Sequence, residues 1–203
     1  MSSPPHLPEE PNQANWTRRS LLTFGAFAAT AGAIRYWPKS GGAEHPESLT
    51  GGNTRPPLPA ETKDYRDFLA AHPLRHLSPR EIIQPHLKTR SGTPCGIPPR
   101  EYWTRILPSL RAADELRERL GVPLKLIISA YRSPEYNAKC PGAARWSQHT
   151  QNRALDLVFD CPSETAFETA LTLRDEGFFT GGLGLYRSFI HLDTRSRNAT
   201  WGA

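Results

Sequence analysis

Residues 154–159 place a carboxylate inside a segment that otherwise has the composition of a buried strand. The segment reads Ala-Leu-Asp-Leu-Val-Phe, and Asp156 is its single charged residue. Apolar and β-branched residues in a run of this length, entered through turn residues at 151–153, are typical of a buried β-strand. A carboxylate is costly to bury unless it meets a cation, hydrogen-bond donors or a metal ion. Asp156 therefore requires a partner from another segment of the chain.

Two histidines stand where the chain could return to Asp156. A turn at 151–153 would bring the His149 imidazole back over the start of the strand. His191 lies in a second strand candidate, residues 184–193, where residues two apart share a face, so that His191 and Asp193 point the same way. Two neutral imidazoles and a carboxylate are a usual ligand set for a catalytic zinc. Each residue taken singly could equally be a packed core residue.

Four ordered segments together resemble a known enzyme family. In chain order they are Ser129-Ala130-Tyr131-Arg132-Ser133, Ser147-x-His149, Ala154-x-Asp156 and His191-x-Asp193. Over residues 77–201 this combination is similar to the zinc D-alanyl-D-alanine carboxypeptidases, the M15 peptidases, in the branch whose last ligand reads His-x-Asp. The resemblance implies an α+β fold of the Hedgehog/DD-peptidase type, in which helices flank a small antiparallel sheet that carries the zinc site.

The resemblance also implies a ligand set and a substrate. One zinc ion per chain would be held by His149, Asp156 and His191, and Arg132 and Ser147 would contact the substrate. Zinc would lower the pKa of a bound water from about 15.7 towards 7 and polarise the scissile carbonyl. The implied substrate is a peptidoglycan stem peptide with a D-residue at or near the cut, cleaved by a D,D-carboxypeptidase or by an endopeptidase.

Two departures from the family pattern bear on the chemistry. Asn152 replaces a usual glycine, and asparagine tolerates the left-handed conformation of a turn. Ser188 stands where many members carry an acidic residue, three positions before the last ligand. Asp193 is then the candidate general base, because strand geometry puts it beside His191. It could instead orient His191, as carboxylates behind metal-bound histidines commonly do.

The first 35 residues have the features of an export signal. Arg18 and Arg19 form a twin-arginine pair ahead of an apolar run at 21–34. A helix of that length spans about 21 Å, less than the roughly 30 Å hydrocarbon core of a membrane. We therefore predict a twin-arginine-type signal peptide over 1–35 and an exported protein, periplasmic or in the cell envelope, with no stable transmembrane span after processing. An uncleaved membrane anchor is the alternative.

The remainder divides into a linker and one domain. Prolines and glycines over 36–60 leave no periodic apolar face, which is typical of a spacer. A zinc peptidase-like domain is expected over 61–203. Its expected helices are at 62–70, from 79, at 98–120 with an interruption at Pro108, from 133 and at 163–176. Its expected strands are at 123–130, 154–159 and 184–193, with a tight turn at 181–184.

Charge and cysteine content limit the possible partners. The net charge of +5 is scattered, without a run of five basic residues, and does not indicate nucleic-acid binding. We expect a monomer whose partner is the peptidoglycan peptide. Of the three cysteines, Cys140 and Cys161 flank the metal segment and are expected to pair, unless all three remain reduced.

Two other functions remain open from the sequence. The first is a catalytically weak, zinc-containing module of the same fold that binds cell-wall peptide, an alternative that Ser188 favours. The second is a Hedgehog-like interaction domain, against which the bacterial-type export signal argues.

Overall fold

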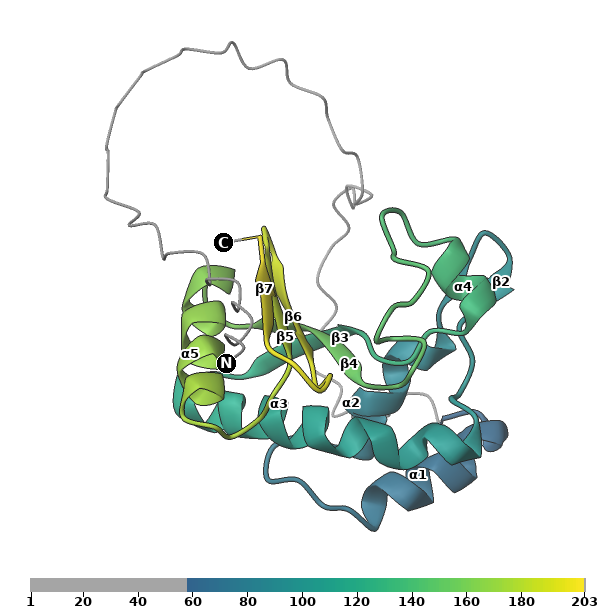
Figure 1. Ribbon diagram of the computed structural model, residues 1–203. Helices are drawn as coiled ribbons and strands as arrows, with labels where there is room; N and C mark the ends of the chain where they lie inside the picture. The colour runs from purple at the N-terminus through teal and green to yellow at the C-terminus, as the bar shows by residue number, and fades with distance from the viewer. Residues whose placement is uncertain (1–57, 203) are drawn as a thin grey trace, which may run out of the picture. The chain divides into compact units, whose positions relative to one another are not determined.

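Residues 58–202, the part of the chain that the computed structural model describes, form an α+β fold (Figure 1). The predicted signal peptide and nearly all of the predicted linker lie outside these residues. The α-helices are α1 (Lys63–Ala70), α2 (Pro79–Ile83), α3 (Leu107–Leu120), α4 (Pro134–Ala138) and α5 (Ser163–Asp175), with 3-10 turns at Ala60–Thr62, Gln84–Leu87 and Arg100–Ile106. Within this range, no helix is both long and apolar enough to cross a bilayer.

The strands form two sheets. They are β1 (Thr89–Arg90), β2 (Thr93–Pro94), β3 (Leu124–Ser129), β4 (Ala154–Phe159), β5 (Gly182–Tyr186), β6 (Phe189–Asp193) and β7 (Ala199–Trp201). The larger sheet has the order β3-β4-β6-β5-β7, and all its pairs are antiparallel except the parallel pair β5–β7. The small hairpin β1–β2 has no counterpart in the sequence analysis, because strands of two residues carry no readable periodicity.

Local sequence signals set the helix boundaries. The side chain of Ser78 accepts a hydrogen bond from the backbone amide of Glu81, and the Glu81 side chain accepts one from the backbone amide of Ser78. These two bonds form a capping box at the start of α2. Pro108 divides the expected helix at 98–120: a 3-10 segment precedes it, and the proline sits in the first turn of α3, where its missing N–H leaves no bond unmade. Gly121 ends α3 in the left-handed conformation, at φ 62°.

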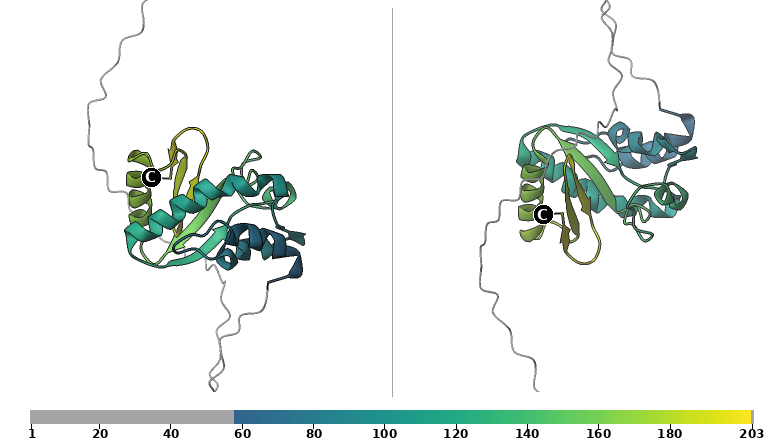
Figure 2. Two further views of the ribbon diagram at one scale, coloured as in Figure 1. Left: turned by 90° about the horizontal axis from the view of Figure 1, so that it is seen from below. Right: turned by 90° about the horizontal axis from the view of Figure 1, so that it is seen from above.

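The five-stranded sheet has one face in the core and one face in the site. Leu155 and Leu157 of β4, with Ile190 and Leu192 of β6, belong to the buried cluster that includes α3 and α5 (Figures 1 and 2). The residues between them alternate to the opposite face, as the period of a strand requires. Asp156 and His191 therefore lie side by side on the face away from these two helices.

A single cross-strand row carries the polar centre of that second face. Its members, paired in register across all five strands, are Ser129, Asp156, His191, Gly184 and Trp201. The expected turn at 181–184 was wrong: Gly182 and Gly184 lie inside β5, and the expected strand at 184–193 is a hairpin that turns at 187–188. The glycines are needed for space, because a Cβ on Gly184 would overlap the Trp201 indole and one on Gly182 would overlap the Asp193 carboxylate.

The expected disulfide is absent. Cys95, Cys140 and Cys161 are all free thiols. Cys140 follows α4, whereas Cys161 follows the far end of β4, next to α5 (Figure 1). A disulfide needs Cα atoms within about 7 Å, and flanking the same segment in sequence does not bring two cysteines that close when the segment is an extended strand.

His86 is a buried histidine outside the candidate metal centre. Its ring lies 5.7 Å from that of Tyr65 and 6.5 Å from that of Tyr131, measured between centroids. Neither ring nitrogen has a hydrogen-bond partner among the described residues. Burial lowers the pKa of His86 from 6.5 to about 4.

We predict that Gly184→Ala destabilises the fold by about 1–3 kcal/mol through overlap with the Trp201 indole. Denaturant unfolding would measure the loss. The matched background is Trp201→Leu, in which the added methyl group no longer meets an indole. An equal cost of Gly184→Ala in both backgrounds would contradict the close approach as its cause.

His86 should make stability depend on pH. Because its folded pKa lies below its unfolded value of 6.5, the unfolded chain takes up a proton that the folded chain refuses. Stability should fall as the pH drops from 6.5 to 4, by up to about 3 kcal/mol. Unfolding curves of chelator-treated protein at both pH values would show this loss diminished in His86→Phe. An unchanged pH dependence in the variant would assign the loss to other groups.

Candidate metal centre

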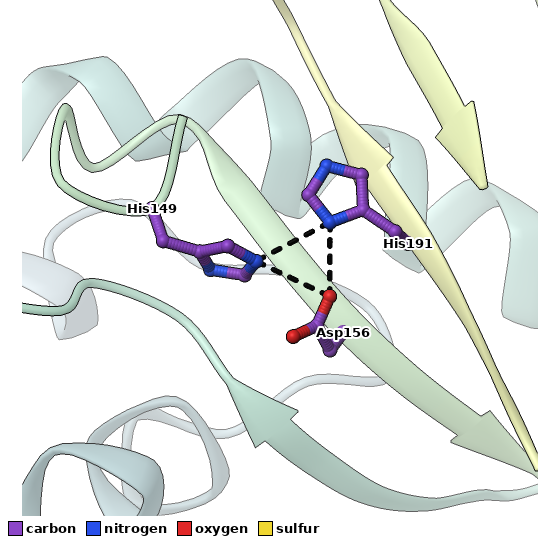
Figure 3. Close-up of side chains that lie close together, drawn as sticks. All are labelled: His149, Asp156 and His191. Carbon is purple, nitrogen blue, oxygen red and sulfur yellow. Dashed lines mark hydrogen bonds and ion pairs between the residues drawn. The ribbon is translucent and has the colours of Figure 1, made fainter. Parts of the chain in front are cut away.

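Three side chains from separate segments converge on one point (Figure 3). Asp156 comes from β4, His191 from β6, and His149 from the turn before β4. His149 Nε2 lies 3.2 Å from Asp156 Oδ1 and 3.2 Å from His191 Nδ1, and His191 Nδ1 lies 2.9 Å from the same carboxylate oxygen. All three residues are buried, and they are the one group of this kind found among residues 58–202.

The turn that delivers His149 is a tight one. The amides of Thr150, Gln151 and Asn152 donate to the carbonyls of Ser147, Gln148 and His149, respectively, which coils the chain just ahead of β4. Asn152 closes the turn at φ 53°, so asparagine does occupy the left-handed position that is usually glycine in the family. Its side-chain amide donates to the Tyr102 carbonyl and ties the turn to the segment before α3.

The outer partners of the two histidines fix which nitrogens carry protons. His149 Nδ1 lies 2.6 Å from the Ala130 carbonyl, which can only accept, so Nδ1 donates and Nε2 keeps its lone pair. His191 Nε2 lies 3.0 Å from Asp193 Oδ2, so the carboxylate holds the proton on Nε2 and leaves the lone pair on Nδ1. When both rings are neutral in these tautomers, two lone pairs and a carboxylate oxygen face one another. Burial opposes protonation of His191, but its hydrogen bonds to Asp156 and Asp193 raise its pKa, so a metal ion at this point would have to displace a proton.

This arrangement fits a tetrahedral cation. Zinc bonds of about 2.0–2.1 Å at tetrahedral angles put neighbouring ligand atoms about 3.3 Å apart. The three atoms here are 2.9–3.2 Å apart, close to one face of such a tetrahedron. The donor set of two nitrogens and one oxygen suits zinc, and all three residues line the cleft described below.

The local electrostatics agree with a cation site. Burial lowers the pKa of His149 and keeps its imidazole neutral, the form that binds a metal. Burial alone would raise the pKa of Asp156, but its contacts with His149 and His191 hold that pKa well below its usual value. Asp156 is therefore an ionised carboxylate in an almost water-free position.

Asp193 lies behind His191, on the ring edge opposite the converging atoms. Its side chain is completely buried, with 0% exposure. Oδ1 accepts the amides of Gly182 and Arg195 and the Nε–H of Arg195, and Oδ2 accepts from Arg195 Nη2 and His191 Nε2. Burial opposes ionisation, but these donors lower the pKa of the Asp193 carboxyl. Both carboxylate oxygens of Asp193 are therefore engaged by donors on the outer side of the His191 ring.

Arg132 lies beside Asp156. Its Nη2 donates to Asp156 Oδ2 at 2.5 Å, and its Nε donates to Ser129 Oγ at 2.7 Å. The Arg132 amide also donates to the His149 carbonyl, which links the end of β3 to the histidine turn. Arg132 thus holds the outer oxygen of Asp156 while its side chain borders the cleft.

A cleft of about 470 Å³ opens over the converging atoms. Ser147, predicted to contact substrate, lines it and also accepts the His149 amide through Oγ. Trp146, 80% exposed, lines it as well. Tyr186 and Trp201 contribute aromatic surface from β5 and β7, and the Trp201 indole N–H donates to the Tyr186 hydroxyl.

Sequence reasoning missed two residues of this cleft. Arg195 lines it and pairs with Asp193, and Trp201 lies 5.2 Å from the His191 ring between centroids. The spacing Asp193-x-Arg195 was a readable signal for an ion pair on one strand face. The position of Trp201 was not readable, because it depends on β7 pairing in parallel with β5.

Comparison with known proteins supports one family. The family profile described as Peptidase M15 matches residues 75–193, more than half of the chain and a range that includes all three converging residues. No curated protein and no solved structure matches the chain significantly. On the strength of the profile match, and in agreement with the site's geometry, the chain belongs to the peptidase M15 family.

Proposed function

We propose that this peptidase is zinc-dependent and cleaves peptide bonds in peptidoglycan stem peptides. The observation that carries the proposal is the convergence of His149 Nε2, His191 Nδ1 and Asp156 Oδ1, with the Ala130 carbonyl and the Asp193 carboxylate as acceptors for the outer nitrogens of the two rings. One zinc ion held by these residues would supply a Lewis acid and an activated water at neutral pH. The substrate is inferred from the family, and the predicted export signal would bring the domain to it.

The chain's own residues then have separable roles. Arg132, with Ser147, binds a carboxylate or backbone group of the peptide and fixes its register in the cleft. Arg132 also neutralises the outer oxygen of Asp156, which keeps that carboxylate ionised and aimed. Asp193 fixes the tautomer and tilt of His191, so we assign it as a positioning residue and not as the general base expected from the strand pattern.

A binding module with weak catalysis is the second candidate. The favouring observation is that no carboxylate other than Asp156 lines the cleft within residues 58–202. Ser188 also stands at the position where the family pattern is often acidic. The two candidates differ in turnover and share the metal, so muropeptide digestion with and without chelator separates them. Chelator-sensitive release of an amino acid or peptide supports the peptidase, and zinc without release supports the module.

His149→Ala and His191→Ala should each abolish stoichiometric zinc binding, because two protein ligands hold the ion far more weakly than three. Elemental analysis of the purified full chain gives the readout. His72→Ala is the matched control, since His72 hydrogen-bonds the Phe68 carbonyl on α1, outside the centre. Full zinc retention in either ligand variant would overturn the ligand assignment.

Asp193→Asn separates positioning from base catalysis. As a positioning residue, Asp193 should contribute about 10- to 100-fold to zinc affinity, and saturating zinc should restore most turnover. As a base, its loss should leave turnover reduced by about 100-fold or more at full zinc occupancy. Zinc titration followed by peptide hydrolysis distinguishes these results. Asp160→Asn is the control, because Asp160 is an exposed partner of Lys125 beyond the end of β4.

A further inference from the structure

Two guanidinium groups line the cleft on opposite sides of the candidate metal centre. Arg132 follows β3 at one edge of the sheet, and Arg195 follows β6 and lies over Trp201 of β7 at the other. Asp156 on β4 and His191 on β6 lie between them. Asp156 is the sole carboxylate lining the cleft in the described chain, and both of its oxygens are engaged. The cleft walls therefore carry more positive than negative charge.

Arg195 has donors left over after it binds Asp193. A guanidinium presents five N–H groups. Arg195 uses Nε–H at 2.8 Å and one Nη2–H at 2.6 Å on Asp193, and its Nη1 has no hydrogen-bond partner among residues 58–202. Its side chain is 27% exposed and borders the cleft. Arg132 has the same pattern, with Nε and Nη2 engaged and Nη1 unused.

The unused donors distinguish an arginine that can bind a ligand from one that only supports Asp193. An arginine that served only to hold Asp193 would need no open path to the cleft. Arg195 instead lies with its guanidinium carbon over the Trp201 ring, 5.5 Å from the ring centroid, so the indole covers one face of the group. A planar group held on one edge by a carboxylate and on one face by an indole is preorganised to bind an anion with its remaining edge.

We propose that Arg195 forms a second anion-binding subsite, which takes a substrate carboxylate on the opposite side of the scissile bond from the group bound by Arg132. The inference rests on the proposed function and narrows its substrate class to peptides that carry a carboxylate on each side of the cut. Four contacts of 2.5–3.0 Å connect the two guanidiniums through Asp156, His191 and Asp193. They therefore lie within about 15 Å of each other, which four or five extended residues span at about 3.3 Å each.

The test compares two peptides on the full chain. One is L-Ala-γ-D-Glu-L-Lys-D-Ala-D-Ala with the glutamate α-carboxylate free, and the other is the same peptide with that carboxylate amidated. Binding to chelator-treated protein is measured by calorimetry, and hydrolysis by zinc-loaded protein gives KM and kcat. The binding measurement does not depend on turnover, so failure of the proposed hydrolysis and failure of the subsite give different results.

The subsite predicts that amidation weakens binding by about 10- to 100-fold and raises KM similarly, with little change in kcat. Arg195→Gln should weaken binding of the free acid by the same factor and abolish the preference, and Arg195→Lys should keep part of it. Arg145→Gln is the matched control, because Arg145 is exposed on Trp146 and does not line the cleft; it should keep the full preference.

Three results would overturn the proposal. One is equal binding of the two peptides by the unmodified chain, and another is binding of neither. The third is a loss of binding affinity in Arg195→Gln that is equal for both peptides and accompanied by loss of zinc. That result would mean that Arg195 only holds Asp193 and His191 in place.

Discussion

The buried carboxylate of Asp156 is the interaction on which the rest of the structure depends. An ionised group in this position is tolerated only because cationic and hydrogen-bonding partners surround it. Arg132 binds one oxygen, and the two imidazoles face the other. Each partner comes from a different segment, so satisfying one carboxylate brings together the end of β3, the histidine turn and β6. The need of the buried Asp156 carboxylate for polar partners therefore also brings together the elements of the site.

The same logic extends one layer outward. His191 can present a lone pair to the centre only because Asp193 holds its other proton, and Asp193 can stay ionised while fully buried only because Arg195 and two backbone amides saturate it. Gly182 and Gly184 leave the space that Asp193 and Trp201 fill. β5 therefore leaves space for the side chains of the site, whereas β4 and β6 carry Asp156 and His191. A strand with two glycines would be weak by itself, and here it is held between β6 and β7.

Features set by residues that are neighbours in the sequence could be predicted, whereas features set by contacts between distant parts of the chain could not. The strand around Asp156, the helix start at Ser78, the interruption at Pro108 and the left-handed Asn152 follow from neighbouring residues, and each was confirmed. The glycines of β5 were misread as a turn because glycine signals a turn in the absence of contrary information. Their actual cause is close packing by residues that follow later in the chain: the Asp193 carboxylate lies against Gly182, and Trp201, seventeen positions after Gly184, lies against Gly184. The pairing of Cys140 with Cys161 was wrong for a related reason, since sequence proximity to a strand does not say which end of the strand each residue occupies.

The position of Asp193 changes how the chemistry at this centre has to be divided. Strand periodicity correctly put Asp193 beside His191, but it could not say whether the carboxylate met the ring from the cleft or from behind. The five hydrogen bonds to Asp193 place its carboxylate behind the ring, and this position is the reason for proposing that it orients His191. With Ser188 at the position that is acidic in many relatives, the described cleft has cationic walls and no spare carboxylate. A cleft with cationic walls raises the local concentration of anionic ligands, which is the physical basis of the proposed preference for anionic peptides.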